Sequence, residues 1–414
     1  MGRLQYFPFS VWFLGILALA AGCQVHSSAI SERASVKANE LLPKISDELL
    51  QKHGLETVWY TEGHEIDRGV HLTELEGDSL FVATRPRSGK TGQLKRVLRA
   101  NGDPQWYLPL SKRLAKAPVI YEYPRGTGGR PGEVFLSQLD TVYCVDLRYG
   151  DVLWKEQVGF AISTRVVATE GMYFSGSETG GVYGLLKQSP ADVWTYRTGG
   201  AVHGSPIVAG THLYAGSTDG TLYRLTTGQG FKQGTTWTLD TGARIVADPV
   251  VFSRWVITGS TDYKIYCCEA QDGTRRWEFS AEAPVEDTPV VYSYASNQEY
   301  VYAIGVERLA RGHKLKRTLF AVKLSSGREQ WRARKVRKVV SMGKRLLYVL
   351  DDNKENPKLR ALDVLTGRER FTLPLDGFRF VPTNLADNGR DRKERGRIYL
   401  IAADGTIQAI GERL

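Results

Sequence analysis

One pattern recurs along the chain and constrains its fold more than any other feature. Residues 144–154 read CVDLRYGDVLW, residues 321–331 read AVKLSSGREQW, and residues 361–371 read ALDVLTGRERF. In each copy an apolar, strand-like segment ends in a turn with a glycine, and an aromatic residue follows four positions later. Glycine adopts positive φ without steric cost, which a tight turn between strands requires. Each copy therefore predicts a β-hairpin that presents one aromatic side chain on a defined face.

The spacing of these aromatic residues predicts the repeat unit. Weaker copies of the pattern occur at residues 98–106 and 268–277. The aromatic residues that occupy the repeated position are Trp59, Trp106, Trp154, Trp194, Trp237, Trp277, Trp331 and Phe371. They lie about 45 residues apart on average, which is the length of a four-stranded blade of a β-propeller. Alternating strand patterns separated by Gly, Asn and Asp turns continue from residue 57 onwards.

The two ends of the repeat region predict how the ring closes. Three strand-like segments follow Phe371 without a further aromatic anchor, and the strand at residues 57–61 has no strands of its own before it. Pairing that first strand with the last three completes an eighth blade and leaves no free sheet edge, whereas seven blades would leave one anchor unexplained. We therefore predict an all-β fold, an eight-bladed β-propeller of four-stranded antiparallel blades that an N-terminal strand closes.

Residues 1–22 predict an export signal. Arg3 gives a positive start, and the apolar run at residues 11–21 is too short to span a bilayer comfortably. Small residues lie directly before Cys23, an arrangement that resembles the lipobox of bacterial lipoproteins. The resemblance implies that Cys23 is acylated and becomes the mature N-terminus. The alternative is an ordinary cleaved signal peptide with an incidental cysteine.

Residues 23–56 predict a lipid-anchored tether with short helices, followed by the propeller at residues 57–414. Pro43 interrupts a first helical stretch, and apolar residues at helical spacing resume at Ile45. In the lipoproteins that this segment resembles, an Asp after the cysteine favours the inner membrane. Gln24 occupies that position here, so the resemblance implies an outer-membrane lipoprotein that faces the periplasm.

The repeated pattern resembles the docking motif of quinoprotein-like (PQQ-like) β-propellers, Ala-x-Asp-x-x-Thr-Gly-x-x-x-Trp. The turn residues that match it most closely are Asp146, Gly150, Gly327, Asp363 and Gly367. Phe371 replaces the tryptophan of the motif in one copy, and Lys323 replaces the aspartate in another. The resemblance implies that the aromatic and turn residues join neighbouring blades, so that their role is structural and not catalytic.

A lipoprotein signal before such a propeller resembles the scaffold lipoproteins of bacterial outer-membrane protein assembly. The resemblance implies a monomeric, non-catalytic platform that binds protein partners in the cell envelope, without a cofactor and without nucleic acid. The alternative is a PQQ-dependent dehydrogenase or another propeller that binds a quinone or ligand. In those enzymes a vicinal disulfide covers the quinone, and Cys267–Cys268 is an adjacent pair. We interpret these cysteines as small residues inside a strand. The histidines show no metal-ligand spacing, and no catalytic residues are predicted.

One basic region is the only functional signal beyond the repeats. Residues 308–345 hold 14 Lys and Arg residues and one acidic residue, Glu329, in a chain of net charge +10. The densest run contains Arg332, Arg334, Lys335, Arg337 and Lys338. The preferred interpretation is solvated strand and loop faces. The alternative is an exposed patch that contacts anionic lipid headgroups or an acidic protein, and whose binding would be sensitive to salt.

Overall fold

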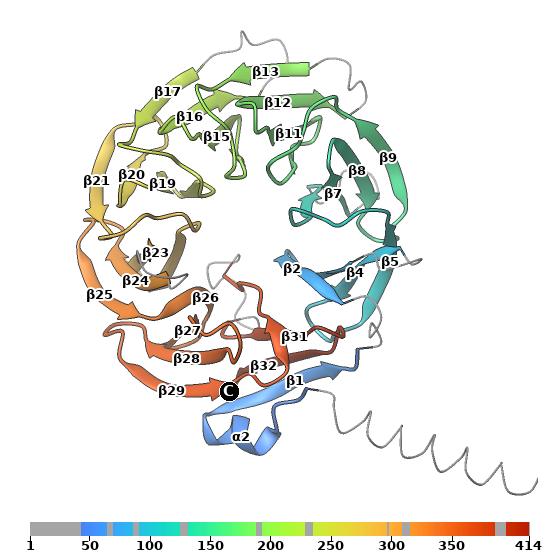
Figure 1. Ribbon diagram of the computed structural model, residues 1–414, viewed down its shortest axis with the longest axis vertical. Coiled ribbons are helices and arrows are strands. Elements are labelled where there is room, and N and C mark those ends of the chain that lie inside the picture. The colour runs from blue at the N-terminus through green and yellow to red at the C-terminus, as the bar shows by residue number, and fades with distance from the viewer. Residues whose placement is uncertain are drawn as a thin grey trace, which may run out of the picture. The chain divides into compact units, whose positions relative to one another are not determined.

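Antiparallel sheets arranged in a ring make up the fold. The computed structural model describes residues 43–63, 69–85, 91–124, 131–187, 193–227, 235–295, 298–308, 315–385 and 395–413. Within these ranges the strands form eight four-stranded sheets, the blades, arranged in a ring (Figure 1). The predicted export segment, Cys23 and most of the predicted tether lie outside the described residues. The prediction of an eight-bladed, all-β propeller is confirmed.

Blades 1 to 7 each use four strands that are consecutive in the chain. Blade 1 contains β2 (Val70–Glu76), β3 (Ser79–Thr84), β4 (Gly92–Leu98) and β5 (Pro104–Leu110). Blade 2 contains β6 (Val119–Glu122), β7 (Gly132–Gln138), β8 (Thr141–Asp146) and β9 (Val152–Gln157). Blade 3 contains β10 (Val167–Ala168), β11 (Met172–Gly176), β12 (Gly181–Leu186) and β13 (Val193–Arg197). Blade 4 contains β14 (Ile207–Ala209), β15 (His212–Gly216), β16 (Thr221–Thr226) and β17 (Thr235–Asp240).

The remaining blades follow the same order until the last. Blade 5 contains β18 (Val250–Phe252), β19 (Trp255–Gly259), β20 (Lys264–Glu269) and β21 (Arg275–Ser280). Blade 6 contains β22 (Val290–Ala295), β23 (Gln298–Arg308), β24 (Leu315–Lys323) and β25 (Glu329–Arg334). Blade 7 contains β26 (Val336–Met342), β27 (Leu346–Asp351), β28 (Lys358–Asp363) and β29 (Glu369–Pro374). Blade 8 contains β30 (Phe378–Phe380), β31 (Ile398–Ala402), β32 (Ile407–Glu412) and β1 (Leu55–Thr61).

The apolar pattern of each strand follows from its place in the blade. The second strands β3, β7 and β31 are buried along their whole length, because neighbouring blades cover both faces of the sheet. The outermost strands alternate instead: in β25, Trp331 and Ala333 are buried while Arg332 and Arg334 are exposed. A strand at the rim has one face on the next blade and one face in water.

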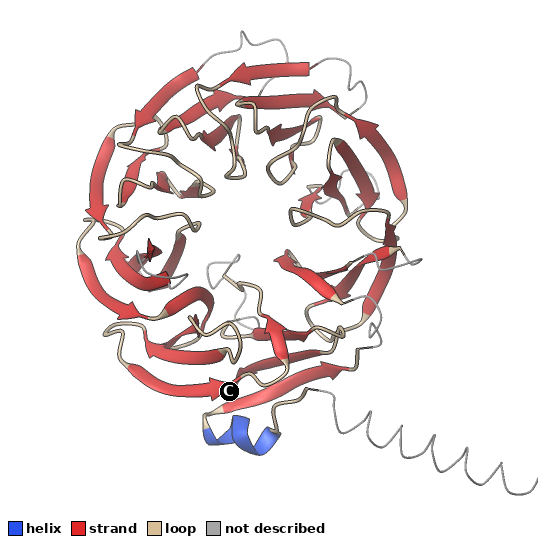
Figure 2. Cartoon of the chain, in the orientation of Figure 1, coloured by secondary structure: helices blue, strands red, loops and turns tan. Residues whose placement is uncertain are grey.

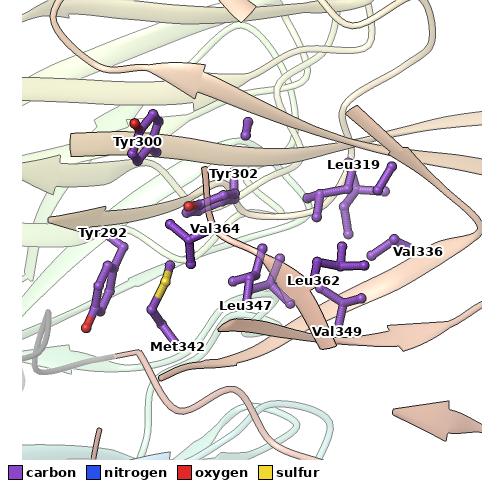
Figure 3. Packing of buried hydrophobic residues seen from close by; sticks show 14 of the residues in the cluster. Tyr292, Tyr300, Tyr302, Leu319, Val336, Met342, Leu347, Val349, Leu362 and Val364 are labelled. Carbon is purple, nitrogen blue, oxygen red and sulfur yellow. The ribbon is translucent and has the colours of Figure 1, made fainter. Parts of the chain in front are cut away.

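Hydrophobic clusters fill the junctions between neighbouring blades. At the junction of blades 6 and 7, Tyr302 and Leu319 of blade 6 pack with Leu347, Val349 and Leu362 of blade 7 (Figure 3). The other junctions of the described ring are filled in the same way. The core is therefore divided into wedges between blades, and removing one blade would expose two of them.

The ring closes through β1, which pairs antiparallel with β32 from Leu55↔Glu412 to Thr61↔Ile407. The strand begins two residues earlier than the predicted segment at residues 57–61. Helix α2 (Asp47–Lys52) precedes it and is the one helix of the described ranges (Figure 2). Ser46 caps this helix by accepting a hydrogen bond from the backbone N–H of Leu49.

Gln408 in β32 forms hydrogen bonds to the segment before β1 and to β1 itself. Its side chain is fully buried in β32. The amide oxygen accepts a hydrogen bond of 2.8 Å from the backbone N–H of Ile45, and the amide nitrogen donates to the carbonyl of Ile45 at 2.9 Å and to Thr57 Oγ1 at 3.0 Å. One side chain thus joins the C-terminal strand to residues more than 350 positions earlier.

We expect Gln408→Ala to lower the free energy of unfolding by about 2 to 4 kcal/mol, because it leaves the buried N–H and C=O of Ile45 without partners. Urea unfolding followed by circular dichroism measures the change. Gln105→Ala on the exposed face of β5 is the matched control and should change stability by less than about 0.5 kcal/mol. Equal losses in the two variants would contradict the closing role of Gln408.

Candidate functional site

The repeated motif forms a contact between blades. The indole of Trp331 in β25 donates from Nε1 to the carbonyl of Val364 in blade 7 at 2.7 Å. Beneath the same ring lies Gly367, in the turn between β28 and β29, at φ +68. A Cβ atom on Gly367 would lie 2.6 Å from the indole, which is closer than any side chain tolerates. Glycine is required there for two reasons, the positive φ and the approach of the ring.

We call this contact a clasp, meaning a tryptophan of one blade that lies on the turn glycine of the next. The same hydrogen bond, at 2.7 to 3.1 Å, joins Trp59, Trp106, Trp237 and Trp277 to carbonyls of Arg99, Leu147, Ala270 and Leu324. The glycines under these rings are Gly102, Gly150, Gly273 and Gly327. Each ring therefore lies on the glycine of the following copy of the motif, and not on the glycine four residues before it.

The aspartates of the motif shape the turn. Asp146 Oδ1 accepts hydrogen bonds of 2.9 Å from the backbone N–H groups of Arg148 and Tyr149. Asp363 Oδ1 accepts from the N–H and the hydroxyl of Thr366 and also binds Arg370 through Oδ2 at 2.7 Å. These bonds hold the pKa of Asp363 below its usual value, with the Arg370 hydrogen bond as the largest cause. Such local bonds are the reason for Asp at the start of a turn.

Three of the aromatic residues at the repeated position, Trp154, Trp194 and Phe371, make contacts other than the clasp. Trp154 packs against Phe135 and Tyr173, with ring centroids 6.0 and 5.4 Å apart, and Trp194 meets the edge of Phe174. Phe371 stacks on His53 at 4.6 Å. His53 caps helix α2 and lies where the chain enters blade 8. Blade 8 has no hairpin between its last two strands, so a histidine from the entering chain occupies the place of a turn glycine. A smaller anchor than tryptophan suits that place.

The basic run does not form one patch. Arg332, Arg334 and Lys335 are exposed at the end of β25 and in the connection to blade 7. Arg337 and Lys338 follow in β26, where a register shift between Val336 and Lys338 marks a β-bulge. The bulge interrupts the alternation of faces, and both residues line a cavity on the inner side of the ring. The residues of the predicted basic run therefore belong to two separate surfaces.

Acidic residues pair with some of the cations in the basic region. Arg332 forms ion pairs of 2.7 and 2.8 Å with Glu329 and Glu282. The other pairs of the region are Arg308–Glu286, Lys316–Glu307 and Arg317–Asp352. Arg334 and Lys335 form no ion pair among the described residues. Ion pairs thus offset four of the 14 cations, and Arg328, Arg334, Lys335, Lys344 and Arg345 remain exposed without an ion-pair partner in the described ranges.

Cys267 and Cys268 lie inside strand β20, and both thiols are fully buried. Their side chains point to opposite faces: Cys267 packs into the junction of blades 5 and 6, and Cys268 into the junction of blades 4 and 5. They are separate thiols, and their positions do not offer a surface on which a planar quinone could lie. Burial raises the pKa of Cys268 to about 12. In the described ranges no group of three or more His, Cys, Asp or Glu residues is placed to hold a metal ion.

The thiols give a test that separates the two interpretations of the cysteine pair. Because burial raises the pKa of Cys268, very little of the thiolate, the form that reacts with an aromatic disulfide reagent, is present at pH 8. We expect the Cys23→Ser chain to show no fast thiol reaction when folded and three reactive thiols when unfolded in urea. One reactive thiol after unfolding would reveal a Cys267–Cys268 disulfide and would contradict the buried-thiol arrangement.

Two polar clusters give no signal in the sequence. Lys187 Nζ binds Glu133 at 2.7 Å with both side chains less than a tenth exposed, and the ammonium lies 4.2 Å from the centroid of the Tyr121 ring. This pair joins blades 2 and 3. Arg165 contacts Glu74 of blade 1 at 3.2 Å and Asp248, before the first strand of blade 5, at 3.6 Å. Lys187 and Arg165 lie in connections next to strands and their partners are distant in sequence, so no local pattern marks them.

The closed ring of four-stranded blades, joined by tryptophans that lie on turn glycines, defines a quinoprotein-like β-propeller. A sequence model of the family described as outer membrane protein assembly factor BamB matches residues 139–233 and 232–410. The chain belongs to this BamB family. A search of curated proteins gave no match.

Solved structures share the fold at low sequence identity. BamB from Moraxella catarrhalis is 16% identical, covers 86% of this chain and 97% of its own, and superposes with a TM-score of 0.61. The computationally designed Ika8 protein is 13% identical, with coverages of 86% and 99% and a TM-score of 0.56. The quinohemoprotein alcohol dehydrogenase ADHIIG from Pseudomonas putida HK5 is 10% identical, with coverages of 90% and 78% and a TM-score of 0.58. At these identities the likeness concerns the fold. No helix in the described ranges is long and apolar enough to cross a membrane.

Proposed function

We propose that the protein is a non-catalytic scaffold that binds a protein partner in the cell envelope and aids outer-membrane protein assembly. We also propose that a lipid on Cys23 anchors it at the periplasmic face of the outer membrane. Membership in the BamB family supports the first proposal. The lipobox-like segment before Cys23 supports the second.

The observation that carries the scaffold proposal is strained backbone on one side of the ring. We call this side the connection face; it holds the turns between second and third strands and the connections between blades. Of the five non-glycine residues at positive φ in the described ranges, four lie there: Leu139, Tyr263, Glu282 and Lys335. Such strain costs about 1 to 3 kcal/mol per residue and is concentrated at functional sites.

Tyr263 illustrates the strain. It lies at φ +72 in the turn Ser260-Thr261-Asp262-Tyr263, whereas the equivalent turn of blade 4 has Gly220 at φ +93. Its side chain is nonetheless 51% exposed, and Leu139 in the corresponding turn of blade 2 is 64% exposed. Both side chains are large, apolar and exposed at positions that favour glycine, and from this backbone strain we infer that they contact another molecule.

Tyr263, Glu282 and Lys335 follow one another over blades 5 to 7 and define the proposed docking arc. Arg334 adds a second exposed cation beside Lys335. An aromatic ring and two cations without ion-pair partners in the described ranges suit a protein with an acidic surface and an apolar side chain at its centre. We expect this association to weaken with salt, because exposed charges are screened.

The alternative of a PQQ-dependent dehydrogenase has less support. The similarity to the quinohemoprotein alcohol dehydrogenase is at 10% identity. The cysteine pair that suggested a quinone site packs into two different blade junctions. Binding of PQQ by the purified protein, seen as quinone absorbance after gel filtration, would favour the alternative.

Affinity capture from native envelopes tests the scaffold proposal and the docking arc together. We expect the tagged wild-type chain to retain a stoichiometric protein partner, and the double variant Arg334→Glu/Lys335→Glu to lose at least about nine-tenths of it. The measurement is quantitative mass spectrometry of the captured material at two salt concentrations.

The matched control reverses two charges on the opposite face. Arg328 and Arg368 are exposed in the turns between third and fourth strands of blades 6 and 7. Arg328→Glu/Arg368→Glu should leave capture unchanged. Equal loss in both double variants would contradict the docking arc, and no partner in the wild-type capture would contradict the scaffold proposal.

A further inference from the structure

A cavity of about 530 Å³ lies on the inner side of the ring, where blades 6, 7, 8 and 1 meet. Its walls come mainly from the innermost strands of these blades, β22, β26, β30 and β2. This volume lies in the range that binds small organic molecules. The docking arc lies elsewhere, because Tyr263, Arg334 and Lys335 are not among the residues of the cavity wall.

Two cations of the basic run belong to this cavity. Arg337 and Lys338 are half-buried, and neither makes a hydrogen bond or an ion pair among the described residues. Burial is the largest influence on both side chains and lowers their pKa values. A cation held out of water without a partner is costly, and an anionic ligand would remove that cost.

The acidic groups nearby do not balance these cations. Asp287 is the one carboxylate in the described wall, and burial raises its pKa. Glu74 acts on Lys338 through space, and Asp351 and Asp352 act on Arg337, but none of the three belongs to the cavity wall. Glu74 is bound to Arg165 at 3.2 Å and Asp352 to Arg317 at 3.6 Å. Arg379 adds another positive charge to the wall. The cavity is therefore net positive.

The rest of the wall is mostly apolar. The apolar lining includes Leu72, Val290, Ile304, Val339, Leu350 and Phe380. Tyr302 is also part of the wall; it is 1% exposed, and its hydroxyl has no hydrogen-bond partner in the described chain. A fully buried hydroxyl without a partner is uncommon in native proteins and calls for an explanation.

We propose that this cavity binds a small organic anion with an apolar body, whose anionic group lies against Lys338 and Arg337. The apolar wall accommodates the body of the ligand, and the two cations select the charged group. Bidentate contact from the Arg337 guanidinium favours a planar carboxylate or a sulfonate over a halide. The proposal does not depend on the scaffold function, because the cavity and the docking arc share no residue.

A pair of dyes that differ in charge tests the proposal on the purified protein. The first is 8-anilinonaphthalene-1-sulfonate, and the second is N-phenyl-1-naphthylamine, which has the same rings without the sulfonate. In fluorescence titrations we expect saturable binding of the sulfonate at one site. Lys338→Met should weaken that binding at least about tenfold while binding of the neutral dye changes less than about twofold.

The double variant Arg328→Gln/Arg368→Gln is the control, because it removes two exposed positive charges that lie neither in the cavity wall nor in the docking arc. It should bind both dyes as the wild type does. Retained binding of the neutral dye by Lys338→Met shows that the cavity of this variant is intact. Lys338→Arg keeps the positive charge and should bind the sulfonate dye as the wild type does, which tests the proposal if Lys338→Met does not fold. Equal sulfonate binding by wild type and Lys338→Met would overturn the proposal. Displacement of the dye by a poly-glutamate peptide would overturn it too, in favour of an acidic protein segment.

Discussion

The contact between a tryptophan and the turn glycine of the next blade is the interaction on which the ring depends. Trp331 bonds to the carbonyl of Val364 and covers Gly367, and this arrangement recurs at four other junctions. The indole buries a large apolar area and satisfies its single donor in the same step. Each clasp uses groups from two blades. The contacts between neighbouring blades therefore contribute to the free energy of unfolding of the whole ring.

At the closure of the ring, in blade 8, other contacts replace the clasp. Blade 8 takes β1 from the other end of the chain, so a covalent hairpin is missing between its last two strands. Buried hydrogen bonds from Gln408 to Ile45 and Thr57 replace that connection, and stacking of Phe371 on His53 replaces a clasp.

The sequence predicted the features that repeat locally. The spacing from Trp59 to Phe371 gave eight blades, and the unpaired first strand gave the manner of closure, because both depend on the order of residues along the chain. The glycine that each indole contacts could not be predicted from this spacing. Gly150 lies four residues before Trp154 but contacts Trp106. Likewise, the division of the basic run at Lys335, the ion pairs that neutralise Arg332, and the cavity at Lys338 depend on contacts between distant segments and on one β-bulge.

A double-mutant cycle on Trp331 tests most directly whether the clasp joins different blades. Urea unfolding would give the stability of Trp331→Phe combined with Gly367→Ala, and of Trp331→Phe combined with Gly327→Ala. If the indole lies on the next blade, the smaller ring makes room for the methyl group only at Gly367, which predicts a coupling energy of about 1 kcal/mol or more with Gly367 and about zero with Gly327. Coupling to Gly327 without coupling to Gly367 would contradict the account.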